Sequence, residues 1–179
     1  MINNSAIVVV DLVNDFVNGV FGSEEAKKTA LRTRGFLDKL RGKYQVIFTM
    51  DSHLENDPEF RVWKQHCVAG TEGSHLVSEL ESFPGYRIKK RHFDSFFDSD
   101  LDGILRANSI SGIFVSGIST DICVLHTVSG AFFRNYDITV ISDLCSSIDL
   151  KNHEKALEDM HRNYGARIMN SKKTLEELL

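Results

Sequence analysis

Short apolar runs rich in β-branched residues alternate along the chain with longer segments whose apolar residues recur at helical spacing. This alternation is typical of βαβ units, in which helices join the parallel strands of one sheet. It predicts strands at residues 6–10, 45–49, 86–89, 112–116, 138–142 and 167–169. It predicts helices at 24–41, 121–133, 152–162 and 172–178, with Gly165 closing the third of them. We therefore expect an α/β fold with a mainly parallel sheet of roughly six strands.

Composition and charge narrow the class of protein. The chain has 179 residues, 42% of them hydrophobic, and no segment resembles a linker or a repeat, so we expect one domain over residues 1–179. A formal net charge of −4 gives no basic surface for nucleic acid. The first apolar run lacks a positively charged start and is broken by Asp11, so we expect no secretion signal, no membrane span and a cytoplasmic location. The three cysteines form no spaced framework, which favours free thiols.

Three of the predicted strands end next to a chemically reactive side chain. Asp11, Lys90 and Cys123 follow the strands at 6–10, 86–89 and 112–116, the last after a short turn. Parallel strands all point the same way, so residues just beyond their ends meet at one edge of the sheet, where ligands usually bind. We therefore expect an acid, an amine and a thiol to be neighbours at that edge.

Cys123 is the candidate nucleophile. Ser119, Thr120 and Asp121 offer helix-capping side chains, so we expect Cys123 in the first helical turn, where free backbone N–H groups favour a thiolate and could hold an oxyanion. The alternative is that Cys123 is a small buried hydrophobic residue.

Asp11 and Lys90 are the candidate base and cation. A carboxylate at the end of an apolar strand needs a partner, and a lysine ammonium would provide one. The alternatives are that Asp11 caps a turn and that Lys90 is a solvated surface lysine. Lys89 is a rival to Lys90 because strand alternation places only one of the pair on the correct face. We interpret Asp15 as a turn or helix cap.

A metal site is predicted at the end of the strand at 45–49. Asp51 and His53 are two residues apart and face the same way, and Glu59 and His66 follow in an aperiodic loop, a kind of segment that is often functional. Such a mixed carboxylate and imidazole set suits zinc, manganese or iron. Glu55 and Asp57 compete with Glu59 for its role. We interpret the other histidines and cysteines as structural or surface residues, namely His75, His92, His126, His153, His161, Cys67 and Cys145.

Three sequence elements carry a resemblance to a known family. They are D-x-x-N-D-F (Asp11, Asn14, Asp15, Phe16), K-x-x-F (Lys90, Phe93) and G-x-x-T-D-x-C-V (Gly117, Thr120, Asp121, Cys123, Val124). With them the chain resembles, over nearly its whole length, the isochorismatase-like cysteine hydrolases. Within that superfamily it is most similar to the nicotinamidase branch, also called pyrazinamidases. The D-x-H pair and the W-x-x-H spacing at Trp63 and His66 are similar to that branch as well.

The resemblance implies a single-domain, three-layer αβα sandwich and a covalent mechanism. In such enzymes the thiol, here Cys123, attacks the amide carbon of nicotinamide. The aspartate, here Asp11, moves the proton, and Lys90 would hold the charged pair. Ammonia leaves, and water then hydrolyses the thioester to nicotinate. The backbone N–H groups of Ser119 and Cys123 would form the oxyanion hole, with a cis peptide bond between Ile118 and Ser119.

The resemblance also implies a cofactor and ring contacts. One divalent metal ion, zinc before manganese or iron, would be held by Asp51, His53, Glu59 and His66 and would bind the pyridine nitrogen. Phe16 and Trp63 would flank the ring, as aromatic side chains there can. Core packing is the alternative for both. The expected partner is a small amide, with neither nucleic acid nor membrane, and because relatives commonly self-associate, a homo-oligomer is a further expectation.

Departures from the family pattern border the expected pocket and bear on the identity of the amide. They are Val13, Lys64, Gln65, Asp94 and Ser95, where relatives often carry other residues. Hydrolysis of another small amide or carbamoyl compound is therefore the alternative activity. A catalytically silent member that acts as a binding subunit is the alternative from a different class. Cleavage of isochorismate is disfavoured because that reaction needs no thiol nucleophile.

Overall fold

The apolar runs of the sequence form the strands of one parallel sheet in the computed structural model, which describes residues 4–179. The strand order is β3-β2-β1-β4-β5-β6, and neighbouring strands pair in parallel. The strands are β1 (Ser5–Val10), β2 (Gln45–Asp51), β3 (Tyr86–Lys90), β4 (Gly112–Ile118), β5 (Asp137–Ser146) and β6 (Arg167–Met169). All six predicted strands are confirmed, and most extend a few residues beyond their expected ends.

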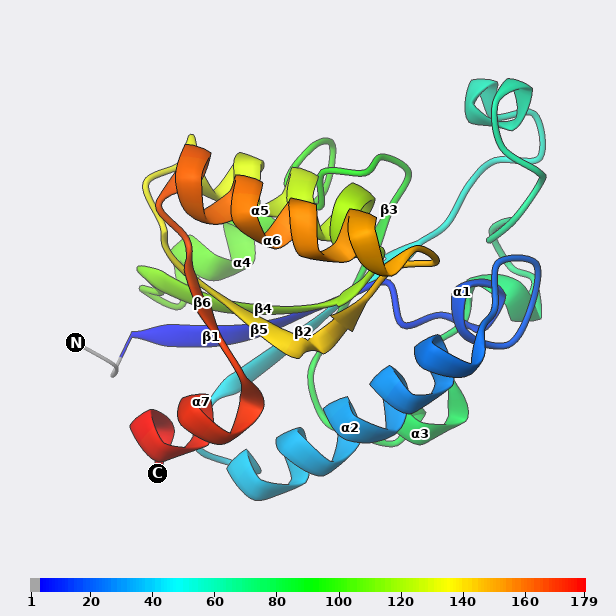
Figure 1. Ribbon diagram of the computed structural model, residues 1–179. Helices are drawn as coiled ribbons and strands as arrows, with labels where there is room; N and C mark the ends of the chain where they lie inside the picture. Colours follow the sequence, from blue (N-terminus) through cyan, green and yellow to red (C-terminus); the bar gives the residue numbers. More distant parts are fainter. Residues whose placement is uncertain (1–3) are drawn as a thin grey trace.

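Helices cover both faces of this sheet, which gives the three-layer α/β sandwich that we expected (Figure 1). One face carries α4 (Leu101–Ala107), α5 (Leu125–Phe132) and α6 (Leu150–Tyr164), and the other carries α2 (Glu24–Leu40), α3 (Ser78–Glu81) and α7 (Ser171–Leu178). Within β1, Ile7 and Val9 belong to the core cluster on the α2 face, while Ala6 and Val8 belong to the other cluster. A strand buried on both faces explains the unbroken apolar run in the sequence.

The sequence pattern missed three short helices. These are α4, α3 and the single turn α1 (Asn14–Val17). The predicted helix at 121–133 also differs from the structure, because its first part is a π-helical turn, η3 (Thr120–Val124), and only the rest is α5. The predicted C-cap is confirmed, since Gly165 has a φ of 65° after the last residue of α6.

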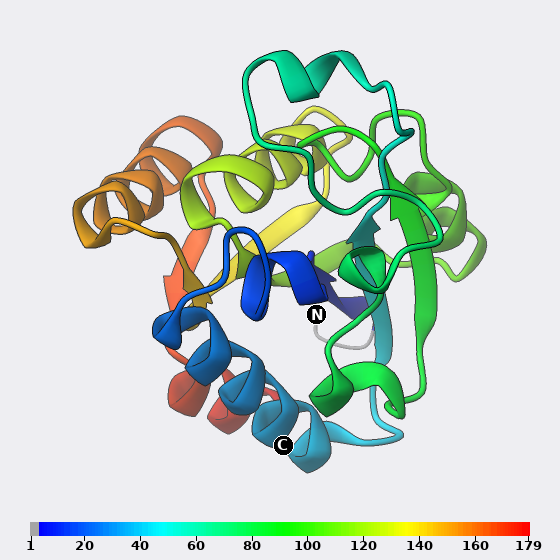
Figure 2. The same cartoon turned by 90° about the vertical axis from the view of Figure 1, so that its right-hand side faces the viewer.

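The carboxyl ends of the strands and the loops that follow them gather at one edge of the sheet, which faces the viewer in Figure 2. A long connection from β2 to α3 lies there, with two 3₁₀ turns, η1 (Pro58–Arg61) and η2 (Glu72–Ser74). Two isolated bridges tie this loop down, one between His53 and Val68 and the other between Val13 and Leu76. In residues 4–179 no helix has both the length and the apolar character that a membrane crossing requires.

Candidate active site

Lys90 lies buried between two carboxylates and a thiol. Its Nζ is 2.6 Å from Oδ2 of Asp11, 3.3 Å from Oδ1 of Asp51 and 3.9 Å from Sγ of Cys123. Lys90 is 1% exposed, whereas its neighbour Lys89 is an exposed residue, because alternate side chains of β3 face opposite ways. The structure therefore places Asp11, Lys90 and Cys123 together, and it excludes Lys89 from the cluster.

Burial and opposite charges set the protonation of this cluster. Burial raises the pKa of Asp11 to about 6, although the Lys90 ammonium opposes the rise. Burial also raises the pKa of the Cys123 thiol well above its ordinary value, although the Lys90 ammonium opposes this rise as well. Burial alone would lower the pKa of Lys90, but the charges around it, Asp11 first, raise it. At neutral pH the proton therefore rests on sulfur, and the neighbouring Asp11 carboxyl group is mostly ionised.

A chain of buried hydroxyl groups leads from α5 to Asp11. The Thr127 hydroxyl donates to Oγ of Ser95 (2.8 Å), the Ser95 hydroxyl donates to Oγ1 of Thr49 (3.2 Å), and the Thr49 hydroxyl points to Oδ1 of Asp11 at 3.5 Å. Asp11 has a φ of 53°, and its N–H donates to the Thr49 carbonyl (3.0 Å). The departure from the family pattern at Ser95 thus supplies a hydroxyl that supports the carboxylate.

Cys123 lies within the π-helical turn η3, at the end of β4. The Ser119 carbonyl accepts the N–H groups of Ile122 (3.1 Å) and Val124 (3.0 Å). The peptide bond between Ile118 and Ser119 is cis, as expected. The expectation of side-chain capping was wrong, because the Ser119 hydroxyl donates to Oδ1 of Asp121 (2.6 Å) and caps no N–H. The expected lowering of the thiol pKa by a helix terminus was also wrong, since burial dominates.

Asp51, His53 and His66 form a cluster that could hold a metal ion. One ligand atom from each lies within 4.8 Å of the others, and all three residues are buried. Oδ2 of Asp51 is 2.9 Å from Nε2 of His53 and 3.5 Å from Nε2 of His66. One carboxylate and two imidazoles fit zinc, manganese or iron, with further positions open to water or substrate. Because Asp51 also contacts Lys90, this cluster adjoins the first one.

The other ring nitrogen of each histidine is held by an outer partner. Nδ1 of His53 is 3.2 Å from Oδ2 of Asp57, and Nδ1 of His66 is 2.6 Å from the Lys64 carbonyl. Outer partners of this kind fix the tautomer and direct Nε2 toward a metal. The fit to a metal therefore extends beyond the ligands themselves.

Glu59, the predicted fourth metal ligand, lies close to this cluster. Oε1 of Glu59 is 3.8 Å from Nε2 of both His53 and His66, although Glu59 is outside the three-residue set. Of its two rivals, Asp57 lies behind His53 and Glu55 is exposed. Glu59 is thus the better placed of the three carboxylates.

Asp15 holds the loop that carries His66. Its Oδ2 accepts the backbone N–H of Cys67 (2.7 Å), and a Cβ on Gly73 would lie 2.1 Å from the same oxygen. Asp15 therefore links two segments that are far apart in the sequence, and the interpretation as a turn or helix cap was wrong. The backbone partner, 52 residues away, gives no signal in the sequence.

A cavity of about 240 Å³ joins the two clusters at the edge of the sheet. Cys123, Asp51 and His66 all line it, as do both predicted ring contacts, Phe16 and Trp63. Lining residues that the sequence did not single out as ring or pocket contacts include Phe21, Ile118, Ser146, Ser147, Ile148, Asp149 and Asn152. Phe21 contacts the rings of Trp63 and His66 edge-on, at centroid distances of 6.0 and 5.1 Å. Aromatic side chains thus form one wall of the cavity that Cys123 also lines.

The chain is similar to known proteins over most of its length. The family described as Isochorismatase domain matches residues 5–173. An N-carbamoylsarcosine amidase from Thermoplasma acidophilum superposes with a TM-score of 0.86 at 36% identity, covering 94% of this chain and 96% of that one. A pyrazinamidase of Pyrococcus horikoshii in complex with zinc has a TM-score of 0.86 at 28% identity, with 93% and 99% covered. A ureidoacrylate amidohydrolase of Caulobacter segnis is 41% identical, over 78% of this chain and 71% of its own.

Proposed function

The chain belongs to the isochorismatase family, and on that basis we propose that it is a cysteine amidohydrolase that converts nicotinamide to nicotinate and ammonia. One observation carries the proposal: the Cys123 sulfur, 3.9 Å from the Lys90 ammonium, lines the same cavity as Asp51 and His66 of the metal cluster. A thiol with a neighbouring acid and cation suits acyl transfer, and a metal beside an aromatic wall suits a ring that carries a nitrogen ligand.

In the proposed reaction Asp11 takes the proton of the Cys123 thiol as sulfur attacks the carboxamide carbon. Lys90 balances the carboxylate before the transfer and the sulfur during it, which a buried charge requires. The oxyanion that forms would accept hydrogen bonds from the backbone N–H groups of Ser119 and Cys123. Asp11 then returns the proton to the departing nitrogen, and ammonia leaves a thioester. Water, deprotonated by Asp11, hydrolyses the thioester, which releases nicotinate and restores the thiol.

The residues that would hold the ring are those of the aromatic wall and the metal cluster. Phe16 and Trp63 offer their ring faces or edges to a planar substrate. Asp51, His53 and His66 would hold a divalent cation, with Glu59 nearest to a further position. When bound, such an ion supplies a Lewis acid for the pyridine nitrogen. The pyrazinamidase complex with zinc supports zinc as the first choice.

Ammonia release from nicotinamide, measured with and without prior treatment with a chelator, tests this function. We expect release that depends on a divalent metal and that falls by at least about a thousandfold in Cys123→Ala. The control is Cys145→Ala, which removes a buried thiol outside the cavity. Full turnover in Cys123→Ala would contradict the covalent mechanism.

A second candidate is hydrolysis of a carbamoyl compound by the same three residues. It is favoured by the likeness to an N-carbamoylsarcosine amidase at 36% identity and to a ureidoacrylate amidohydrolase at 41%. In that case ammonia would be released from the carbamoyl compound, and a chelator would leave the rate unchanged. Release from no small amide at all would favour a silent binding subunit.

A further inference from the structure

We propose that Asp149 makes this cavity selective for uncharged amides, so that it rejects substrates bearing a carboxylate and readily releases its own carboxylate product. The inference rests on the proposed function and deepens it. Its basis is the charge of the cavity wall that follows the end of β5. There the turn after β5 and the start of α6 contribute Ser147, Ile148, Asp149 and Asn152.

The described lining of the cavity holds four carboxylates and no lysine or arginine. Asp51 and Glu59 belong to the metal cluster or adjoin it, but Asp121 and Asp149 do not. In residues 4–179 Oδ1 of Asp121 accepts the hydroxyl groups of Ser119 (2.6 Å) and Ser147 (2.7 Å), which carry no charge. The buried Lys90 does not line the cavity, and its charge is already balanced by Asp11 and Asp51. At this wall of the cavity a substrate anion would therefore find no lysine or arginine to pair with.

At this wall an anion could be attracted by the amino terminus of α6, a helix of 15 residues. Free N–H groups and the helix dipole favour negative charge at such a terminus. Asp149 already occupies that position, because it is the N-cap and its Oδ1 accepts the N–H of Lys151 at 2.7 Å. Lys151 does not line the cavity. The protein's own carboxylate thus takes the place that a substrate carboxylate would use.

Product release follows from the same charge. The proposed reaction starts from a neutral amide and water and ends with a carboxylate anion, ammonia and a proton. The anion forms in a cavity whose wall carries Asp121 and Asp149, so repulsion favours its departure. The same repulsion acts on N-carbamoylsarcosine and on ureidoacrylate, each of which carries a carboxylate before it reacts. The charge of the wall therefore separates the two candidate substrates.

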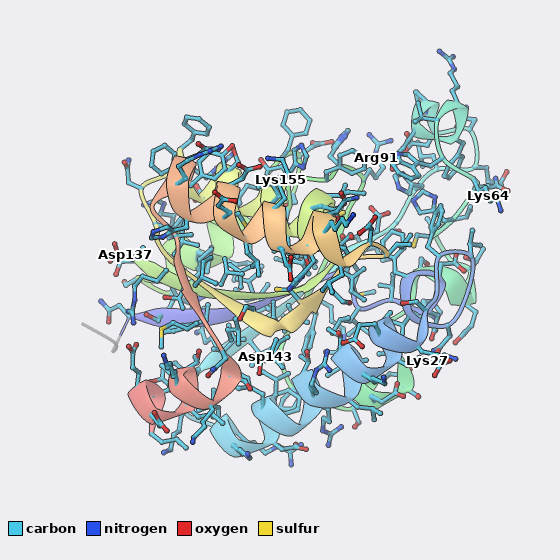
Figure 3. All side chains as sticks on the ribbon, in the orientation of Figure 1. Lys27, Lys64, Arg91, Asp137, Asp143 and Lys155 are labelled. Atoms are coloured by element: carbon cyan, nitrogen blue, oxygen red, sulfur yellow. The ribbon has the colours of Figure 1, made fainter. Side chains whose placement is uncertain are left out.

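The substitution Asp149→Asn removes the charge and keeps the cap, because asparagine is as good an N-cap as aspartate. We expect the inhibition constant of nicotinate to fall roughly two- to fivefold at low ionic strength, with the KM for nicotinamide nearly unchanged. This fall in the inhibition constant should become smaller as salt is added. The matched control is Asp137→Asn, an exposed aspartate at the opposite end of the sheet (Figure 3), which should leave the constant unchanged.

A second experiment adds a positive charge to the cavity. Ile148 is 79% exposed and lines the cavity, so Ile148→Lys should fold normally and place a cation at the mouth. We expect it to raise kcat/KM for N-carbamoylsarcosine relative to Ile148→Gln, which changes polarity without charge. The wild-type protein should prefer nicotinamide to N-carbamoylsarcosine by about tenfold or more, as like charges in one site disfavour binding.

Two results would overturn the inference. One is wild-type kcat/KM for N-carbamoylsarcosine that equals or exceeds that for nicotinamide. The other is a nicotinate inhibition constant that does not fall in Asp149→Asn. If nicotinamide is not hydrolysed, the proposed function fails, and the inference is then judged by calorimetry on Cys123→Ala with nicotinamide and N-carbamoylsarcosine. In that measurement, anything other than weaker binding of the anion overturns it.

Discussion

At the scale of single residues, Lys90 is the group on which the cluster depends. It is the only cation within hydrogen-bond or ion-pair distance of Asp11 in residues 4–179, and it also contacts Asp51. Removing one member of a buried charge cluster leaves the others without compensation, which is far more damaging than losing a surface pair. This asymmetry separates Lys90 from its neighbour Lys89, although the two are alike in the sequence.

We predict that Lys90→Met abolishes ammonia release and lowers the free energy of unfolding by about 3–5 kcal/mol, because the Asp11 carboxylate remains buried with no cation beside it. Urea unfolding and the activity assay measure the two effects. Lys89→Met is the matched control and should change both by little, since Lys89 is exposed. Equal effects in the two variants would contradict the assignment of Lys90.

The pKa of Asp11 predicts how activity depends on pH. Burial raises it to about 6, and only the ionised carboxylate can take the thiol proton. We therefore expect kcat/KM to be lost as the pH falls through about 6 and to be recovered above it. In Thr49→Val the ionised form loses a neighbouring hydroxyl, so the midpoint should move to higher pH. A midpoint that stays in place, or moves down, would count against Asp11 as the base.

At the scale of elements, β4 and the loop after β2 shape the site, and each depends on a local feature. Gly117, near the end of β4, has a φ of 126°, and a Cβ there would lie 1.9 Å from the Val10 carbonyl oxygen. That close approach sets the path of the chain toward Ser119 and Cys123. In the loop after β2, Asp57 fixes the ring of His53 from behind.

We predict that Gly117→Ala is strongly destabilising, because the clash is with backbone and the φ is unfavourable for alanine. Gly35→Ala is the control, since Gly35 lies inside α2 with open space around its Cβ position. That variant should stabilise the protein by about 0.5–1 kcal/mol through helix propensity. Thermal unfolding compares the two, and a tolerated Gly117→Ala would show that β4 has another way to approach β1.

Metal retention tests the role of Asp57. We expect Asp57→Ala to weaken metal affinity about 10- to 100-fold, because His53 loses the partner that orients its ring. Competition with a chelator, read as bound metal per protein, measures this without any assay of activity. Glu55→Ala should retain the metal, as Glu55 is exposed. Similar loss in both variants would point to general disturbance of the loop.

At the scale of the whole molecule, hydrophobic patterning was enough to predict the parallel sheet, and topology was enough to bring Asp11, Lys90 and Cys123 to one edge. Strand order and the helix α4 could not be predicted. α4 is only seven residues long and contains Gly103, so its pattern is weak. The choice of carboxylate near the histidines of the loop after β2 could not be predicted either. Glu55, Asp57 and Glu59 cannot be told apart in a segment without periodicity. Only the packing of the loop separates an exposed carboxylate from one behind a histidine.

The measurement that tests the central claim most directly is a crystal structure of the protein soaked with nicotinaldehyde, the aldehyde analogue of nicotinamide. An aldehyde carbon accepts a thiol but has no nitrogen to release, so the adduct would persist. We predict a covalent bond from Sγ of Cys123 to that carbon, with the oxygen at the Ser119 and Cys123 N–H groups and the ring nitrogen toward Asp51, His53 and His66. An unmodified Cys123, with the aldehyde absent from the cavity or bound away from the sulfur, would contradict the account.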